Sequence, residues 1–137
     1  MVFNAPNEDI EKMRPPEGEA VSFNADAEVI AGQVVKMTGG GSVSPGDTAG
    51  ETAYGVSTQS VATGDDLTVL GSGARVLFTA AGSVSPGDPL TVDPSTNEGE
   101  VAPATTTGDY IIGYAHGSAG GQGDTFVGVV DRGGEVN

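Results

Sequence analysis

The balance of glycine and valine against leucine most constrains the fold of this chain. Its 137 residues include 23 glycines and 17 valines but only four leucines. Valine loses rotamer freedom in a helix and packs well on a pleated sheet. No window of twelve or more residues free of Gly and Pro has its apolar side chains at helical spacing. The sequence therefore predicts an all-β fold.

Seven short apolar runs, separated by turn residues, are predicted to be strands. They lie at residues 27–37, 52–57, 66–70, 74–80, 89–93, 110–115 and 125–131. Strands of this length and spacing are typical of a small barrel or sandwich. We therefore expect a single small barrel or sandwich domain over residues 21–137.

Residues 1–20 have a different composition from the rest of the chain. They contain five acids, two of the five basic residues and three prolines. We interpret them as an extended N-terminal arm, in which residues 7–13 are the best helical candidate. Its apolar residues have no obvious place in the predicted barrel, so they either dock on a partner or are disordered, as chain termini commonly are. The candidate capsid-binding residues of the arm are Val2, Phe3, Ile10, Met13, Arg14 and Pro15.

The heptapeptide GSVSPGD occurs twice, at residues 41–47 and 82–88. Proline presets φ at the second position of a type II turn, glycine supplies the positive φ of the third, and aspartate bonds nearby backbone N–H groups. Both copies are therefore predicted to form the same structural turn rather than a binding site. The turn residues are Pro45, Gly46 and Asp47 in the first copy, and Pro86, Gly87 and Asp88 in the second.

The alternative function for these loops is calcium binding. Five Gly-Asp pairs occur in the chain, and residues 120–124 resemble the opening of a calcium-binding β-roll repeat. The pairs are unevenly spaced, so they cannot stack as a β-roll, and no EF-hand loop is present. We expect no bound cofactor, although a calcium- or glycan-binding surface module stays open as an alternative.

The catalytic inventory of the chain is small. It has no cysteine, which excludes thiol catalysis, and His116 is its one histidine. A metal site built on several histidines is therefore excluded, and a small hydrolase would have to use His116 with an aspartate. No Gly-Lys-Ser/Thr phosphate-binding loop occurs. The sequence predicts a protein that is not an enzyme.

Charge is the strongest compositional signal. Nineteen acidic residues oppose five basic ones, for a net charge of −14 spread from Glu8 to Glu135. We expect no nucleic-acid partner, because phosphate contacts need clustered Lys and Arg. No apolar run reaches the length of a membrane span or a signal peptide, so we expect no membrane partner and synthesis in the cytoplasm.

This even acidic composition suits a protein that works in concentrated salt, where the Debye length falls to about 3 Å and self-repulsion is screened. We therefore predict a halophilic source, with loss of structure below roughly molar salt. An ordinary acidic protein from a moderate environment is the alternative.

Three segments in order resemble the capsid decoration, or cement, proteins of tailed viruses. They are residues 30–40 (IAGQVVKMTGG), residues 53–95, which include GDDLTVLGSG and GDPLTVD, and residues 111–133, which begin IIGYAHG. The resemblance covers about residues 20–133 and lies in turn-and-strand patterns.

The resemblance implies a small β-barrel or β-tulip domain. It also implies a virion protein made in the host cytoplasm that sits as a homotrimer on the capsid exterior, at three-fold or quasi-three-fold positions. Its partner would be the major capsid protein, its N-terminal arm would reach the capsid, and it would stabilise the head. Together with the acidic composition, it suggests a virus of halophilic archaea. Another virion adaptor, such as a turret or fibre base, is the nearest alternative.

Overall fold

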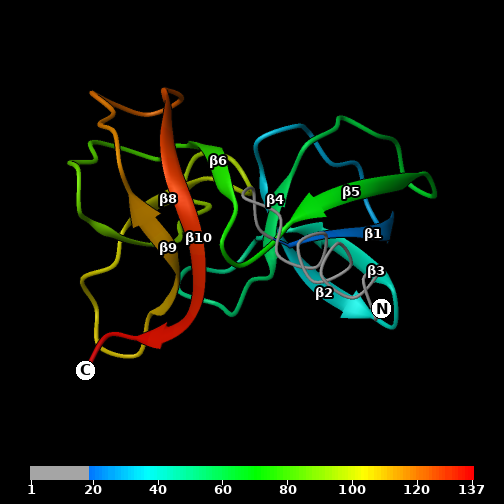
Figure 1. Ribbon diagram of the computed structural model, residues 1–137, viewed down its shortest axis with the longest axis horizontal. Coiled ribbons are helices and arrows are strands. Elements are labelled where there is room, and N and C mark those ends of the chain that lie inside the picture. The colour runs from blue at the N-terminus through cyan, green and yellow to red at the C-terminus, as the bar shows by residue number, and fades with distance from the viewer. Residues whose placement is uncertain (1–18) are drawn as a thin grey trace, which may run out of the picture.

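The computed structural model describes residues 19–137, which form two five-stranded sheets lying side by side (Figure 1). The first sheet closes into a barrel in the order β1-β3-β2-β4-β5, and we call it the N-terminal barrel. The second has the order β6-β10-β9-β7-β8, and we call it the C-terminal sheet. The described residues contain no helix, so the all-β prediction is confirmed.

The ten strands are short, as the spacing of turn residues predicts. The barrel contains β1 (Ala20–Ala25), β2 (Val34–Gly39), β3 (Ser42–Pro45), β4 (Gly55–Ser57) and β5 (Asp66–Leu70). The C-terminal sheet contains β6 (Arg75–Thr79), β7 (Pro89–Val92), β8 (Val101–Pro103), β9 (Tyr110–Ala115) and β10 (Thr125–Glu135).

The seven predicted strands correspond to seven of these ten, and β1, β3 and β8 were not predicted. β1 begins at the boundary assigned to the arm, β3 lies inside the first heptapeptide, and β8 is only three residues long. The proposed helix at residues 7–13 and the arm residues Val2, Phe3, Ile10, Met13, Arg14 and Pro15 lie outside the described residues.

The two sheets repeat one pattern of strand pairing. In the barrel, β1 pairs with β5, β2 with β3 and β4, and β4 with β5, all antiparallel. In the C-terminal sheet, β6 pairs with β10, β7 with β8 and β9, and β9 with β10, again antiparallel. The parallel β1–β3 pair has its counterpart in the isolated bridge between Ala80 and Val101. The chain therefore contains two copies of one five-stranded motif.

Two glycines at equivalent positions confirm this correspondence. Gly55 in β4 and Gly113 in β9 both lie in buried strands that cross a neighbouring backbone closely. A Cβ at Gly55 would lie 2.2 Å from the carbonyl oxygen of Leu70, and one at Gly113 would lie 2.2 Å from that of Val129. Only glycine leaves room for this approach, so both motifs close at the same point in the same way.

The second heptapeptide forms the predicted turn. Gly87 has φ 90°, and the N–H of Asp88 donates to the carbonyl of Ser85 at 3.1 Å. The Asp88 carboxylate accepts from the N–H of Ser85 at 2.9 Å. Asp109 and Asp124 bond the backbone of their own loops in the same way. These Gly-Asp pairs thus begin strands by fixing the preceding turn.

The prediction is wrong for the first heptapeptide, in which Pro45 ends strand β3 and Gly46 is buried at the junction of the two sheets. The Gly46 N–H donates to the carbonyl of Val34, and the Gly46 carbonyl accepts from the N–H of Gly99. These bonds hold the segment extended. The reversal comes afterwards, around Thr48 to Glu51, so Asp47 follows the strand instead of ending a turn.

The hydrophobic core joins the two sheets. One cluster fills the barrel and includes Phe23, Val35 and Leu67. The other fills the C-terminal sheet around Phe78, but it also contains Val34 and Val56 from the barrel. Because these barrel side chains belong to the second cluster, the two motifs are packed into one unit.

Candidate functional site

A pocket of about 530 Å³ opens where β2, the segment before β4, and the strands β9 and β10 meet. Its lining contains two of the three tyrosines of the chain and two of the three basic residues in the described part. We call its main side chains the junction surface. They are Lys36, Met37, Tyr54, Tyr110 and Arg132.

Arg132 is held firmly in this surface. It lies in β10 between Val130 and Gly134, where the pairing with β9 shifts register, and such a bulge re-aims side chains. Its guanidinium lies 4.1 Å from the ring centroid of Tyr54, and Nη1 donates to the Tyr54 carbonyl at 3.0 Å. The Tyr54 ring in turn packs edge-on against Phe23 at 5.1 Å. A cation stacked on a ring in this way presents a rigid, mixed surface.

Glu19, the first described residue, completes the cluster. Its carboxylate accepts from Arg132 Nη1 at 3.1 Å. Burial would raise the pKa of Glu19, but hydrogen bonds from Tyr54 and Arg132 outweigh it and leave that pKa below its ordinary value. Burial and the same carboxylate raise the pKa of Tyr54. Glu19 is therefore anchored beside the junction surface.

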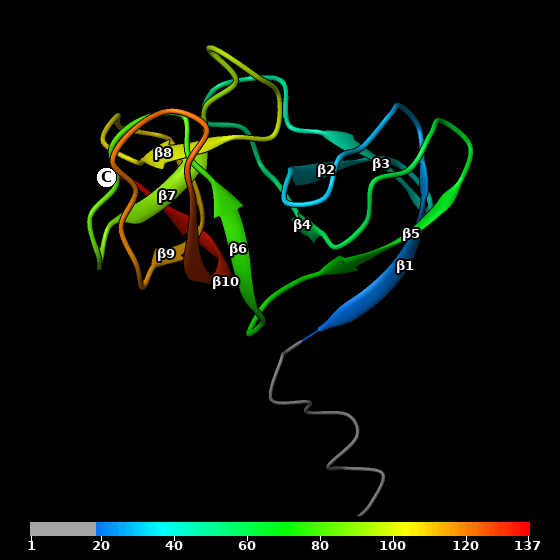
Figure 2. The same ribbon diagram turned by 90° about the horizontal axis from the view of Figure 1, so that it is seen from above.

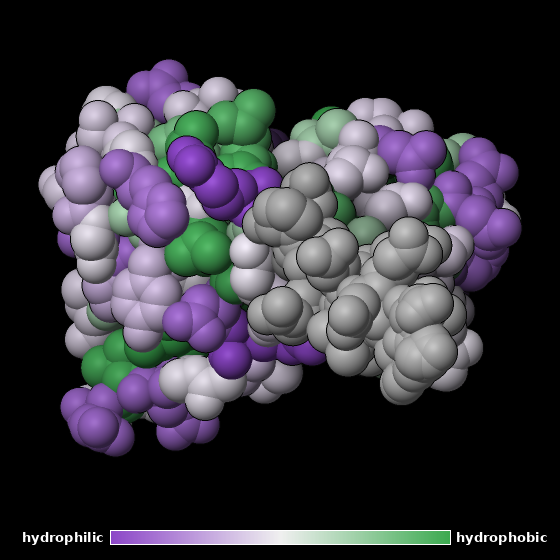
Figure 3. All heavy atoms as spheres, in the orientation of Figure 1, coloured by the Kyte–Doolittle hydropathy of each residue, from purple (hydrophilic) through white to green (hydrophobic). Residues whose placement is uncertain are grey.

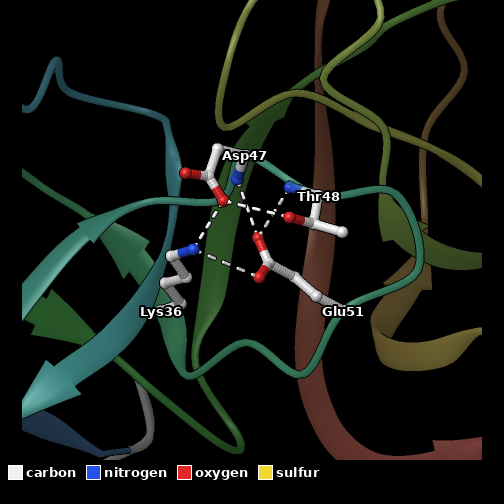
Figure 4. A network of polar contacts seen from close by, with 4 residues as sticks. All are labelled: Lys36, Asp47, Thr48 and Glu51. Atoms are coloured by element: carbon white, nitrogen blue, oxygen red, sulfur yellow. Dashed lines mark hydrogen bonds and ion pairs between the residues drawn. The ribbon is translucent and has the colours of Figure 1, made fainter.

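A second ion-pair network includes Lys36 and Glu51 of the pocket lining, and Figure 4 shows it from close by. Lys36 Nζ points between the carboxylates of Asp47 and Glu51, donating to Asp47 Oδ1 and, at 3.3 Å, to Glu51 Oε1. The other oxygen of Glu51 accepts from the N–H groups of Asp47 and Thr48 at 2.7 and 2.9 Å. The hydrogen bond with Asp47 raises the pKa of Lys36 and lowers that of Asp47.

The composition of this surface resembles that of protein interfaces. Tyrosine, arginine and methionine are enriched at the centres of protein interfaces, and Met37 is 53% exposed here.

Within residues 19–137, no group of three or more His, Cys, Asp or Glu side chains is placed to hold a metal ion. His116 is exposed in the loop after β9. The described part of the chain also has no helix long and apolar enough to cross a membrane.

The residues predicted as structural turns lie around the sheet junction or on loops. Pro45 and Gly46 are buried, Gly46 lies against Val92, and Asp47 belongs to the Lys36 network. The second turn, Pro86 to Asp88, lies at the start of β7 with Pro86 and Gly87 exposed.

Sequence reasoning missed Tyr54, Tyr110 and Arg132. The available signal was their rarity, because the chain has only three tyrosines and three arginines. Their convergence depends on pairings between segments far apart in the sequence, which no local pattern reports.

The described residues thus form a duplicated five-stranded all-β motif with a mixed aromatic and charged surface at its junction. A family model described as phage cement protein matches residues 15–130. The chain belongs to the phage cement protein family and is a capsid-associated structural protein of the virion. The resemblance to cement proteins is thereby confirmed.

The fold is similar to that of a solved structure, the N base of the head fiber gp8.5 in bacteriophage phi29. The TM-score is 0.64 at 20% sequence identity, over 87% of this chain and 98% of that one. A search of curated proteins finds no match.

Proposed function

We propose that this protein stabilises the viral head by binding as a homotrimer to the outer surface of the major capsid protein lattice, at three-fold or quasi-three-fold positions. The observation that carries the proposal is membership of the cement family together with an interface-like junction surface. The protein is made in the host cytoplasm and does no chemistry of its own.

The mechanism is thermodynamic. A protein that binds only the assembled lattice stabilises it by mass action. Contacts within a trimer and with several capsid subunits act together, so individually modest contacts give strong attachment. Rigid binding groups suit this role because little side-chain entropy is lost when they bind, and Tyr54 and Arg132 are already fixed in the free protein.

The N-terminal arm extends this contact to the capsid. Val2, Phe3, Ile10, Met13, Arg14 and Pro15 are its proposed contact residues. Glu19, the first described residue, lies next to the junction surface, and we propose that this surface and the arm contact the same part of the lattice.

The decisive experiment compares heads stripped of this protein with heads to which it has been restored. Release of DNA on heating, followed with an intercalating dye, is expected at a higher temperature for the restored heads. A Met37→Asp, Tyr110→Ala double variant should restore less protection, whereas Asp65→Asn, on an exposed turn away from the pocket, should act like wild type. Equal release temperatures for stripped and restored heads would refute lattice stabilisation.

The oligomeric state has its own test. Light scattering with mass determination, in about 2–3 M salt to screen repulsion, should give a trimer for the full chain and for a chain lacking residues 1–16. A trimer in both cases would assign self-association to residues 17–137. A monomer in both would contradict the proposed trimer in solution.

The likeness to a head-fiber base favours a second function, that of an adaptor carrying another virion protein. This function predicts that virions lacking the chain also lose a further protein. Mass spectrometry of such virions distinguishes the two functions, because a cement role alone leaves the remaining protein composition unchanged.

A further inference from the structure

Strand β6 leaves one of its edges without a full partner strand. It pairs with β10 on one side, and on the other the described residues supply only the Ala80–Val101 bridge. The N–H of Ala80 donates to Asp124, and the carbonyl of Ala74 accepts from Val130. Since backbone groups alternate in direction along an antiparallel strand, those of Arg75 and Leu77 point to the opposite edge. That edge lies on the side of the C-terminal sheet nearest the barrel (Figure 2).

A groove runs along this edge. It consists of two adjoining pockets of about 340 and 580 Å³, which share Ala31 and Thr79 in their walls. Apolar side chains, including Val56, Leu70 and Leu77, line the smaller pocket together with polar ones and Arg75. Leu77 is 55% exposed. On the face drawn in Figure 3, the lobe of the C-terminal sheet shows several separate hydrophobic areas, each bordered by hydrophilic residues.

The larger pocket is strongly acidic. Glu28, Glu98 and Glu100 line it, and no basic side chain does. Glu100 is only 4% exposed; one of its oxygens accepts from Gln122 Nε2 at 2.7 Å, while the other has no hydrogen-bond partner. A buried carboxylate that is only partly satisfied is costly, and a nearby cation would offset that cost.

We propose that this groove binds an extended segment of a capsid subunit, which adds as a strand beside β6 and places a Lys or Arg side chain among Glu28, Glu98 and Glu100. The free backbone groups of Arg75 and Leu77 supply the main-chain bonds of strand addition, and the apolar pocket selects an adjacent side chain. The inference rests on the proposed function, because it names the capsid element that the protein would hold.

Charge complementarity favours this occupant over a second copy of the chain. The chain has a net charge of −14 and only five basic residues, so another copy would bring mostly acidic groups to an acidic pocket. A capsid segment carrying Lys or Arg meets no such repulsion.

Hydrogen exchange of the wild-type protein, free and bound to stripped heads of its own virus, tests the site directly. The amide of Leu77 is expected to exchange at least about tenfold more slowly in the bound state, as hydrogen bonding to an added strand requires. Unchanged exchange at Leu77 in protein that does bind heads would overturn the inference. Protection of Leu77 in the free protein at high concentration would also overturn it, by assigning the edge to self-association.

Matched variants measure the contribution of each part of the groove. Leu77→Pro removes a donor that β10 does not use, and Ser22→Pro makes the same change at the equivalent place in β1. Glu98→Lys reverses a charge in the groove, and Asp65→Lys reverses one on an exposed turn outside it. Leu77→Pro and Glu98→Lys should each weaken head binding about tenfold relative to their controls.

The outcomes separate the two proposals. Failure of the wild-type protein to bind stripped heads would refute the proposed function. The groove would be refuted if the wild type binds heads, Glu98→Lys binds them as tightly as Asp65→Lys, and Leu77→Pro binds them as tightly as Ser22→Pro. That result would leave the proposed function standing. Should Leu77→Pro fail to fold, Glu98→Lys and the exchange of Leu77 still decide the result.

Discussion

The N-terminal barrel and the C-terminal sheet share their strand pairings but differ in what they leave at the surface. Ser22 in β1 lies opposite Thr68 in β5, and at the equivalent place in the second motif Leu77 lies opposite Val127. Two residue pairs join the parallel strands β1 and β3 and close the barrel, whereas a single residue bridge connects the end of β6 with β8. One copy of the motif is thus closed and has a polar pair at this place, and the other keeps an open edge and has an apolar pair there.

This difference shows how a duplicated motif can divide its tasks. Pairing and core positions are constrained in both copies, since both must bury their inward side chains. The outward face is constrained only by solubility, so equivalent outward positions can differ between the copies, as Ser22 and Leu77 do. Both proposed binding sites lie where the copies meet, because that junction is the one place where they present different elements to each other.

The largest expected effect is that of salt, and it should act on both motifs alike. Residues 19–70 contain seven acids against one base, and residues 71–137 eight against two, so each part has a net charge of −6. Lowering the salt from about 2 M to a few millimolar lengthens the Debye length many-fold and exposes this repulsion. We expect the β-sheet circular dichroism signal to be lost throughout in dilute buffer. An unchanged spectrum would contradict the halophilic interpretation.

Truncation of an aromatic core residue should show whether the motifs unfold together. Phe78 is fully buried and stacked on Phe126 at 5.7 Å, so Phe78→Ala should lower the free energy of unfolding by about 4 kcal/mol. Its counterpart Phe23 is 7% exposed, and Phe23→Ala should cost about 3 kcal/mol. Because Val34 and Val56 pack into the second core, denaturation in high salt should remain one transition for both variants. Two separate transitions would show that the motifs are independent.

The equivalence of the motifs predicts matching effects at Gly55 and Gly113. A Cβ at either position would lie 2.2 Å from a backbone oxygen. Because the clashing atom belongs to the backbone, no side-chain rotation can relieve the clash. Gly55→Ala and Gly113→Ala should each cost about 3 kcal/mol, the upper end for overpacking. Gly82→Ala, where a Cβ would meet no atom within 4 Å, is the control and should be nearly neutral. A large cost at one position only, read from chemical denaturation midpoints, would break the correspondence.

The all-β fold was predictable because it depends on local signals. Turn residues such as Gly87 and Asp88 fix where strands begin, and the apolar runs mark most of the strands. The duplication was not predictable, since the repeated heptapeptides are not equivalent in space. The counterpart of residues 82–88 is the segment 27–33, which shares the bridge pattern of Val29 and Val84 but not the letters.

The first heptapeptide shows why local reasoning fails at a junction. The Pro-Gly pair at Pro45 and Gly46 has turn-forming residues, yet contacts with Val34, Gly99 and Val92 keep it extended. The junction surface was hidden for a related reason. Arg132 and Tyr54 are far apart in the sequence, and only the bulge in β10 brings the guanidinium onto the ring.

The smallest expected effect concerns Glu19, whose contact with Arg132 joins the first described residue of the barrel to the extended end of β10. The folded pKa of Glu19 lies below its ordinary value of 4.5, so the stabilisation is present above that pH and is lost as the pH falls through the folded pKa. Glu19→Gln should therefore lower the free energy of unfolding by about 0.5 kcal/mol at pH 7, a small value because the side chain is partly exposed. The difference from wild type should vanish at the acidic end of a pH series.

Asp65→Asn removes the same charge from an exposed turn and controls for net charge. A difference between Glu19→Gln and wild type that persists below the folded pKa would mean that packing, not the ion pair, anchors Glu19 beside the junction surface.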